Sequence, residues 1–140
     1  MKSALLGVAV AVLAGSTAGC HDPVRSSPIP PSGQAFIFHI SKINAPDSVL
    51  PGVPLSVVLT ALSGGCARFD RIETEKNSSG ASVTVWGVNP QIGNPRMACT
   101  ADLRVEPHTL TFDPPFASSF TIVVNRPPPE APLVARVEVR

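Results

Sequence analysis

The sequence has no tyrosine, a single tryptophan and few charges, since only 15% of its 140 residues are Asp, Glu, Lys or Arg. Lys and Arg number 11 against 10 Asp and Glu, which leaves a formal charge of +1. A nucleic-acid binder needs clustered basic charge to displace counterions from phosphates, so this balance argues against that class. The shortage of aromatic rings also leaves no obvious platform on which a sugar could stack.

Helix-forming segments are also scarce. The 16 prolines and 10 glycines are too many for a helical bundle, because each proline inside a helix costs roughly 3 kcal/mol. Beyond the first twenty residues, no segment keeps a 3.6-residue hydrophobic period over ten residues. Hydrophobic residues nevertheless make up 44% of the chain, which is enough for a core and excludes a disordered tail protein. An all-β domain is therefore expected, with almost no helix.

Motifs that carry catalysis are missing as well. No G-x-S-x-G element positions a nucleophile, no D-x-[DN]-x-[DN]-G loop gathers calcium ligands, and no glycine-rich loop cradles phosphate. Carboxylates alternate with basic residues in one segment, a pattern typical of a solvated, charge-mixed face. These residues are Arg68, Asp70, Arg71, Glu73, Glu75 and Lys76. We expect a protein that is not an enzyme and that binds no cofactor.

Residues 1–20 have the layout of an export signal. Lys2 provides a positive start, residues 3–15 form an uncharged apolar stretch, and small residues follow it. The apolar stretch is shorter than the about 20 residues that span a membrane, but it suits the middle region of a signal peptide. The segment is therefore expected to direct export.

The end of this segment resembles the lipobox of bacterial lipoproteins. Ala18, Gly19 and Cys20 match that pattern, whereas Thr17 stands where the family usually has an aliphatic residue. The resemblance implies that Cys20 carries a diacylglycerol and becomes the N-acylated first residue of the mature chain. The alternative is an ordinary secretory signal that is cut near Ala18.

This interpretation divides the chain into three parts. Residues 1–19 would be removed as a lipoprotein signal peptide, and residues 20–34 would form the lipidated cysteine and a proline-rich tether. Prolines favour extended polyproline geometry, so we expect the tether to be a semi-rigid spacer. Residues 35–140 would form one small domain. The acyl chains at Cys20 would hold it on a membrane of the cell envelope, facing the periplasm or the exterior.

Alternating hydrophobic residues, separated by proline-rich connections, predict seven or eight short strands in the domain. The clearest signal is a hairpin, in which segments 69–75 and 81–88 flank a short loop that contains Asn and Gly. The other expected strands are 35–43, 54–62, 97–105, 110–112, 118–125 and 133–140. His39 is expected at a surface or edge and His108 in a connection. Short strands at this spacing indicate a sandwich or a barrel.

Segment 64–69, the hairpin, residues 98–100 and segment 120–125 together resemble small immunoglobulin-like domains of bacterial envelope lipoproteins. The resemblance implies an immunoglobulin-like antiparallel β-sandwich. Two features depart from antibody domains: Cys66 and Cys99 are much closer in sequence than the antibody pair, and no tyrosine can form a tyrosine corner.

Cys66 and Cys99 are the two cysteines of the expected domain. Because the cell envelope is oxidising, the simplest expectation is one disulfide between them. The alternative is a metal site that also uses His39 and His108. That alternative has no C-x-x-C or H-x₃-H pair to bring ligands together, and no methionine follows His108 to complete a blue-copper set.

The expected function is non-catalytic, with the domain binding or positioning another envelope component, most simply an envelope protein. Free sheet edges would provide the surface, since they offer unpaired backbone groups to a partner strand. A small-ligand or metal carrier is the second interpretation, and it requires a pocket. An enzyme inhibitor, or an enzyme, is the third, because function does not follow from fold.

Overall fold

The computed structural model describes residues 34–92 and 94–140. These residues form nine strands and no helix, so the expected all-β class is confirmed. Consequently the described ranges contain no helix that could cross a membrane. The predicted signal peptide, the predicted lipid site at Cys20 and the tether up to residue 33 lie outside the described residues.

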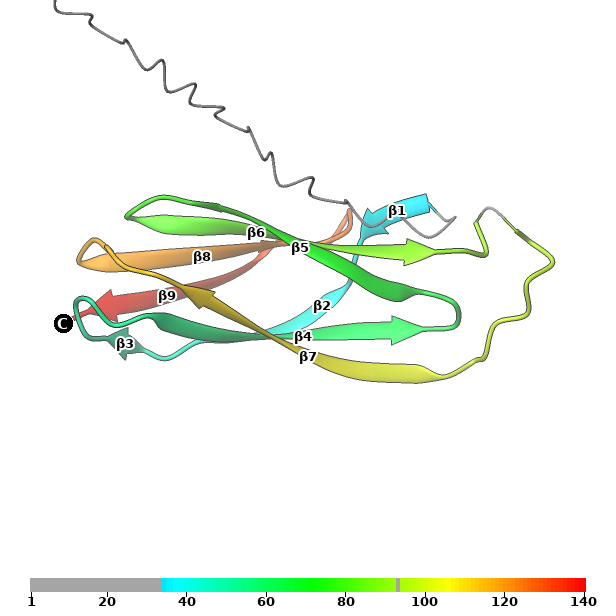
Figure 1. Ribbon diagram of the computed structural model, residues 1–140, viewed down its shortest axis with the longest axis horizontal. Helices are drawn as coiled ribbons and strands as arrows, with labels where there is room; N and C mark the ends of the chain where they lie inside the picture. The colour runs from blue at the N-terminus through cyan, green and yellow to red at the C-terminus, as the bar shows by residue number, and fades with distance from the viewer. Residues whose placement is uncertain (1–33, 93) are drawn as a thin grey trace, which may run out of the picture.

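The strands lie in two sheets, seen from one long side in Figure 1. In chain order they are β1 (Gln34–Ile37), β2 (Ile40–Asn44), β3 (Ser48–Val49), β4 (Leu55–Gly64), β5 (Arg68–Lys76), β6 (Gly80–Asn89), β7 (Leu103–Phe112), β8 (Ser119–Asn125) and β9 (Leu133–Val139). The larger sheet has the order β1-β6-β8-β9-β3, with β5 also paired to β6. The smaller sheet has the order β2-β4-β7. Two facing sheets are compatible with the predicted sandwich.

The inner faces of both sheets meet in one apolar core. In β4, β6 and β8, buried residues alternate with more exposed ones, as a strand with one face toward a core requires. Phe120 and Ile122 of β8, for example, are fully buried. The other core residues are Phe38, Ile40, Leu55, Val57, Leu59, Ala61, Ala81, Val83, Val85, Phe112, Val124 and Val137.

The predicted hairpin is confirmed as β5 and β6. Its two strands pair antiparallel, with an irregularity between Phe69 and Arg71. In the turn, the Asn77 side-chain oxygen accepts hydrogen bonds from the N–H groups of Ser79 and Gly80, at 2.9 and 3.0 Å. Asn favours turns for this reason, because its side chain can bond backbone groups two or three residues ahead.

The expectation of one strand over residues 35–43 is wrong. The chain forms β1 in the larger sheet, crosses at residues 38–39, and continues as β2 in the smaller sheet. Phe38 and Ile40, on either side of His39, are 1% and 0% exposed. The alternating pattern signals which side chains enter the core, but both sheets share that core, so it does not signal a change of sheet.

The strand count and pairing also differ from the expected seven or eight antiparallel strands. β3 falls within a predicted connection, is two residues long, and pairs in parallel with the end of β9. β8 pairs in parallel with β6. A two-residue strand is too short to show periodicity. Parallel pairing depends on where the chain returns after crossing between sheets, and local sequence does not encode that.

The region from 97 to 112 needs the largest correction. Strands were expected at 97–105 and 110–112, with His108 in a connection between them. Instead, residues 97–102 form no strand, and β7 runs unbroken through Pro107 and His108. β7 pairs with β4 over ten consecutive residues without a shift in register.

Pro107 fits inside β7 because its nitrogen faces the free edge of the sheet. The Leu62 N–H donates to the His39 carbonyl at 3.0 Å, so the backbone groups of Leu62 point toward the β2 side of β4. Alternate residues of a strand direct their backbone groups to opposite sides. The odd-numbered residues of β4 therefore bond to the even-numbered residues of β7. Pro107 is odd-numbered, so its missing N–H breaks no bond between β4 and β7.

Candidate functional site

The inner face of the β4–β7 pair changes from apolar to polar along its length. The facing partners are, in order, Leu55 and Phe112, Val57 and Leu110, Leu59 and His108, Ala61 and Glu106, and Ser63 and Arg104. The first pairs pack in the core, whereas the last two bring the Ser63 hydroxyl and the Glu106 carboxylate together at the inner face, with the Arg104 side chain 65% exposed at the rim. Charged residues are rarely placed on an inward face for stability. This polar end, defined by Ser63, Arg104, Glu106 and His108, is therefore the candidate site.

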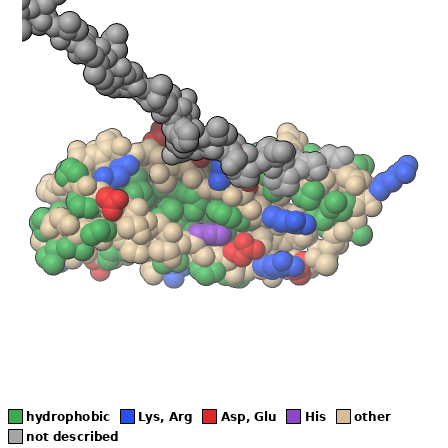
Figure 2. Space-filling model, viewed as in Figure 1, with side chains coloured by type: hydrophobic (Ala, Val, Ile, Leu, Met, Phe, Trp, Pro, Cys, Tyr) green, Lys and Arg blue, Asp and Glu red, His purple; other side chains and the backbone are tan. Residues whose placement is uncertain are grey.

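Figure 2 shows the visible long side of the molecule. Hydrophobic side chains gather over its left and centre, with a few acidic and basic side chains among them, and a smaller hydrophobic group lies toward the right. A histidine lies near the middle, and acidic and basic side chains follow it toward the right.

Ser63, Glu106 and His108 form a chain of polar contacts at the polar end. The Ser63 Oγ–H donates to Glu106 Oε1 at 2.5 Å, and Ser63 is 3% exposed. The second oxygen, Oε2, lies 3.9 Å from His108 Nε2, which is buried and has no hydrogen-bond partner among the residues that the structure describes. A serine nucleophile needs an adjacent base to accept its proton, commonly a histidine. Here the hydroxyl donates to a carboxylate instead, so the arrangement suits polar binding better than nucleophilic attack.

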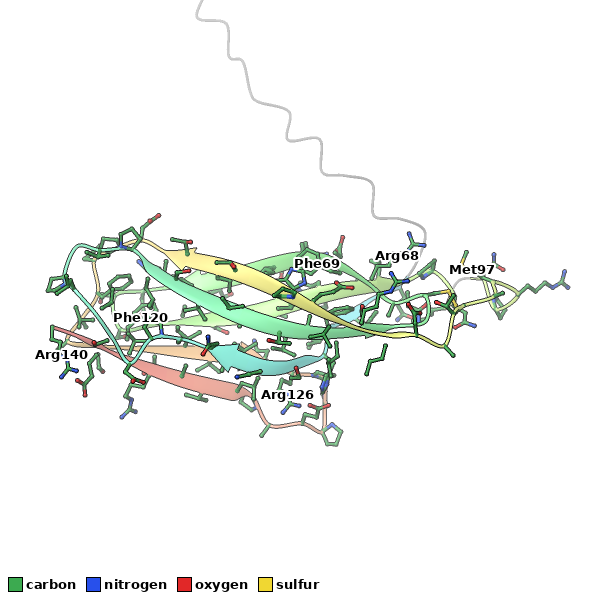
Figure 3. The ribbon with its side chains drawn as sticks, turned by 90° about the horizontal axis from the view of Figure 1, so that it is seen from below. Arg68, Phe69, Met97, Phe120, Arg126 and Arg140 are labelled. Atoms are coloured by element: carbon green, nitrogen blue, oxygen red, sulfur yellow. A yellow bond between two sulfur atoms is a disulfide. The ribbon has the colours of Figure 1, made fainter. Side chains whose placement is uncertain are left out.

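A cavity of about 490 Å³ opens beside these residues. Ser63, Glu106, Arg68 and Phe69 line it. The Phe69 ring stacks on the imidazole of His108, with a centroid distance of 4.2 Å and an interplanar angle of 23°. Figure 3 places Arg68 and Phe69 near each other on β5, across the molecule from Arg126. The volume lies within the roughly 300–1,000 Å³ that is typical of small-molecule sites.

Two arginines line the cavity in different electrostatic surroundings. The Arg104 Nε–H donates to Asp102 Oδ2 at 2.5 Å, and the Thr100 hydroxyl donates to the same carboxylate. Both bonds lower the pKa of Asp102 below its usual range, and the bond from Thr100 has the larger effect. Arg68 is exposed and forms no ion pair with any residue that the structure describes. Arg68 is therefore the cation of this cavity that remains available to a ligand.

The disulfide predicted from the sequence closes one wall of the cavity. Cys66 and Cys99 lie at disulfide distance, with their Cα atoms 5.1 Å apart. The bond ties the turn after β4 to the connection that precedes β7. Gly65, in that turn, has a φ of +62°, which glycine adopts without strain, and its N–H donates to the Asp102 carbonyl at 3.3 Å. The polar end is thus held by a covalent bond and by backbone contacts.

The opposite long side is closed by an ionic cluster. His39 Nδ1, between β1 and β2, lies 3.0 Å from Glu130 Oε1 in the connection between β8 and β9. Arg126 pairs with the other oxygen of the same carboxylate. The side chain of His39 is 35% exposed, in agreement with its expected place at an edge. This cluster links the two sheets on the side away from the cavity.

The predicted charge-mixed face lies on the outside of β5 and β6. Glu73 accepts hydrogen bonds from Arg71 Nε at 2.9 Å and from Trp86 Nε1 at 2.7 Å. The bond from Arg71, and then that from Trp86, lower the pKa of Glu73, while the pKa of Arg71 is raised. The Arg71 guanidinium also lies 5.3 Å from the centre of the Trp86 ring. These contacts fix an exposed surface and leave the cavity unaffected.

The structure brings together one of the predicted sets of residues. Cys66 and Cys99 meet, whereas His39 pairs with Glu130 and His108 stacks on Phe69. Across residues 34–92 and 94–140, no three His, Cys, Asp or Glu side chains are placed to hold a metal. Sequence reasoning missed Ser63 and Glu106. The signal that could have found Glu106 is the alternation of polar residues at 104, 106 and 108 across Pro107.

No family model, curated protein sequence or solved structure matches the chain.

Proposed function

We propose that this chain is a non-catalytic lipoprotein of the cell envelope whose domain binds or positions another envelope component. The observation that carries the proposal is the polar end on the open long side between β5 and β7. There the protein keeps Glu106 and His108 on an inward face, beside a cavity and beside Arg68, which forms no ion pair within the described part of the chain. Polar groups retained where apolar ones would stabilise more are typical of functional surfaces.

The two long sides of the sandwich differ in how well they can accept a partner. On the open side, β7 offers a regular edge of ten residues, and β5 offers an exposed strand of nine residues that is rich in charged side chains. On the other side, β2 has five residues and β3 has two, and the cluster of His39, Arg126 and Glu130 lies between the sheets. The open side therefore offers the larger binding surface.

An immunoglobulin-like arrangement is part of the proposal. The chain places β4 in the smaller sheet, β5 and β6 in the larger one, β7 back in the smaller one, and β8 and β9 again in the larger one. This repeated crossing between two sheets supports the assignment. The parallel neighbours β6 and β8 are a departure from the antiparallel pairing of that class.

Anchoring is tested by the substitution Cys20→Ser in the full chain. Because Cys20 would carry the acyl chains, the variant should leave the membrane fraction or accumulate as an uncleaved precursor. Thr17→Leu is the matched control, since it brings the segment closer to the lipobox pattern and should leave anchoring intact. A Cys20→Ser variant that is processed and stays in the membrane like the wild type would contradict the lipid site.

Binding at the open side is tested by photocrosslinking in the cells that make the protein. A photoreactive residue replaces Thr74, an exposed position of β5, and in a second variant it replaces Val134, which is 60% exposed on β9. One defined protein adduct is expected at Thr74, weakened by Arg68→Glu, and none at Val134. Equal labelling at both positions would refute a binding role for the open side.

The cavity favours one second candidate, a carrier of a small ligand. Its volume of about 490 Å³ and the available charge of Arg68 are the observations in its support. A carrier should retain a small molecule through purification, and native mass spectrometry should show the added mass. Substituting Arg68→Gln should remove that mass if the cavity holds the ligand.

A further inference from the structure

The free edges of β5 and β7 differ in how strongly they discourage pairing with a further strand. β5 carries six charged residues in nine and an irregularity in its pairing, two features that discourage edge-to-edge association. β7 pairs with β4 without a shift in register, so its first half, residues 103–107, presents a regular edge. In the first half of β7, Pro107 removes a single N–H from that edge, and Arg104 and Glu106 are its two charged residues, fewer than on β5.

Two exposed hydrophobic side chains mark the same half of β7. Leu103 is 73% exposed and Val105 is 65% exposed, the highest values among the large hydrophobic residues that the structure describes. Both are odd-numbered and so lie on the outer face, beside backbone groups that point to the free edge. An exposed apolar pair next to unpaired backbone groups indicates a contact surface.

Residues 102–108 are self-complementary when two copies run antiparallel about Val105. On the inner face, Arg104 of each copy falls opposite Glu106 of the other, and Asp102 falls opposite His108. On the outer face, Val105 meets Val105, and Leu103 meets Pro107. Arg104 and Glu106 thus bring opposite charges face to face on one side of the pair, while apolar side chains meet on the other.

From this complementarity we infer that the first half of β7 binds a second copy of the same chain. The two strands pair about a twofold axis at Val105, which joins the two smaller sheets edge to edge. A twofold axis gives an isologous contact, in which each copy contributes the same patch. Leu103 and Val105 are then covered on both copies.

The backbone supports this register despite the proline. Val105 points its backbone groups to the free edge, so the two Val105 residues exchange both N–H···O=C bonds. Leu103 also points to the free edge, and its N–H donates to the Pro107 carbonyl of the other copy. The N–H that Pro107 lacks would have paired with the Leu103 carbonyl, so each Leu103–Pro107 pair loses one bond.

Moving the axis to Leu103 would require pairing through residues 100–102, which form no strand. Moving it to Pro107 weakens the complementarity, although Glu106 then lies opposite His108. With Pro107 on the axis, proline faces proline, so the central pair forms no backbone bond. Arg104 then lies opposite Leu110 instead of a carboxylate. The register about Val105 is therefore favoured by charge, by apolar contact and by backbone bonding together.

The pairing of two copies uses the same open side as the proposed function. It rests on that function in one respect, the anchoring of the chain on a membrane. An edge contact of this length is small, so it needs a high local concentration, which anchoring on one membrane supplies. A second copy would then be one of the components that the domain positions. The two ideas fail separately, because binding at β5 does not require pairing at β7.

Cysteine cross-linking of the full chain in isolated membranes tests the pairing. With Val105→Cys, the two new thiols lie at a pair whose Cα atoms are about 5.5 Å apart, within the range for a disulfide. A reductant-sensitive adduct of twice the chain mass is expected. Thr109→Cys is the matched control: it is exposed on the same strand and face, but it lies four residues from the axis, so it should stay monomeric.

Three outcomes would overturn the inference. They are no adduct with a folded Val105→Cys chain, equal adducts with both variants, or an adduct with a different protein. Peptide mapping of an intact bond between Cys66 and Cys99 shows that the variant is folded. An adduct with another protein would refute the second copy while leaving the proposed function in place.

Charge exchange gives an independent test in the Val105→Cys background. Arg104→Glu places like charges opposite each other at two symmetric positions, so the initial rate of cross-linking should fall about tenfold. Glu106→Arg should have the same effect. The chain with both substitutions restores opposite charges and should recover most of the rate. A double variant no better than either single one would contradict the proposed register.

Discussion

The two ends of the sandwich differ in what fills the space between the sheets: aromatic rings at the apolar end, and polar side chains with a cavity at the polar end. At the apolar end, the rings of Phe112 and Phe116 lie 5.7 and 4.9 Å from that of Phe120, which is fully buried. At the polar end, the same two sheets enclose Ser63, Glu106 and a cavity. Figure 3 shows this separation, with Phe120 toward one end and Arg68 and Met97 toward the other.

This difference indicates where the stability of the domain comes from. Close packing of aromatic and aliphatic side chains can hold the apolar end by itself. The polar end buries less apolar surface, and there the chain is tied by the disulfide between Cys66 and Cys99. A covalent bond at this end lets the inward face keep polar groups that a core would otherwise replace.

The largest loss of stability is expected from Phe120→Ala, at the apolar end. Removing a fully buried ring leaves a cavity between the sheets, so the free energy of unfolding should fall by about 3–5 kcal/mol. Urea unfolding of the full chain measures the change. Val134→Ala, at an exposed position of β9, is the control and should shift it by less than about 0.5 kcal/mol. Similar losses from both variants would contradict the packing described for the apolar end.

The disulfide should contribute almost as much at the polar end. It closes a loop of sequence separation 33, and restricting the unfolded chain in this way is worth about 3.5 kcal/mol. The variant with both Cys66→Ser and Cys99→Ser should lose that amount, and reductant should affect the wild type alone. Alkylation and mass spectrometry check the bond directly. Two modified thiols at these positions without reductant would refute it.

Replacing His108 by an apolar residue should stabilise the protein. Within residues 34–92 and 94–140 the buried Nε2 has no hydrogen-bond partner, and a group left in this state costs about 1–3 kcal/mol. His108→Leu removes that cost but also loses the stacking on Phe69, so a net gain of about 1 kcal/mol is expected. Thr109→Leu, on the outer face of the same strand, controls for strand preference. A loss of stability with His108→Leu would show that the histidine has a partner in solution.

The smallest effect concerns the exposed contact of Glu73 with Trp86, away from both ends. The pKa of Glu73 lies below the ordinary glutamate value of about 4.3. Its bonds to Arg71 and Trp86 therefore persist as the pH falls through that value, and they are lost only at a lower pH, when the carboxylate is protonated. The fluorescence of the single tryptophan should therefore titrate with a midpoint below that of an ordinary glutamate. Arg71→Gln should raise the midpoint, whereas Glu75→Gln should leave it in place. An unshifted midpoint in the wild type would contradict the contact.

The sequence alone was sufficient to identify the strands that have strict alternation. Segment 54–62, the hairpin, and segments 118–125 and 133–140 all correspond to observed strands, because burial of one face imposes a period of two that can be read locally. The disulfide was predicted from the number of cysteines together with the expected export to an oxidising compartment. These properties depend on composition or on neighbouring residues.

Tertiary structure decided the rest. The change of sheet at His39, the parallel pairing of β8 with β6, and the continuation of β7 through Pro107 depend on which strands lie side by side. Ser63 and Glu106 are 43 residues apart and meet because β4 and β7 pair in one register. A candidate site built from such distant residues has no local signature, since its geometry exists only after the sheets have formed.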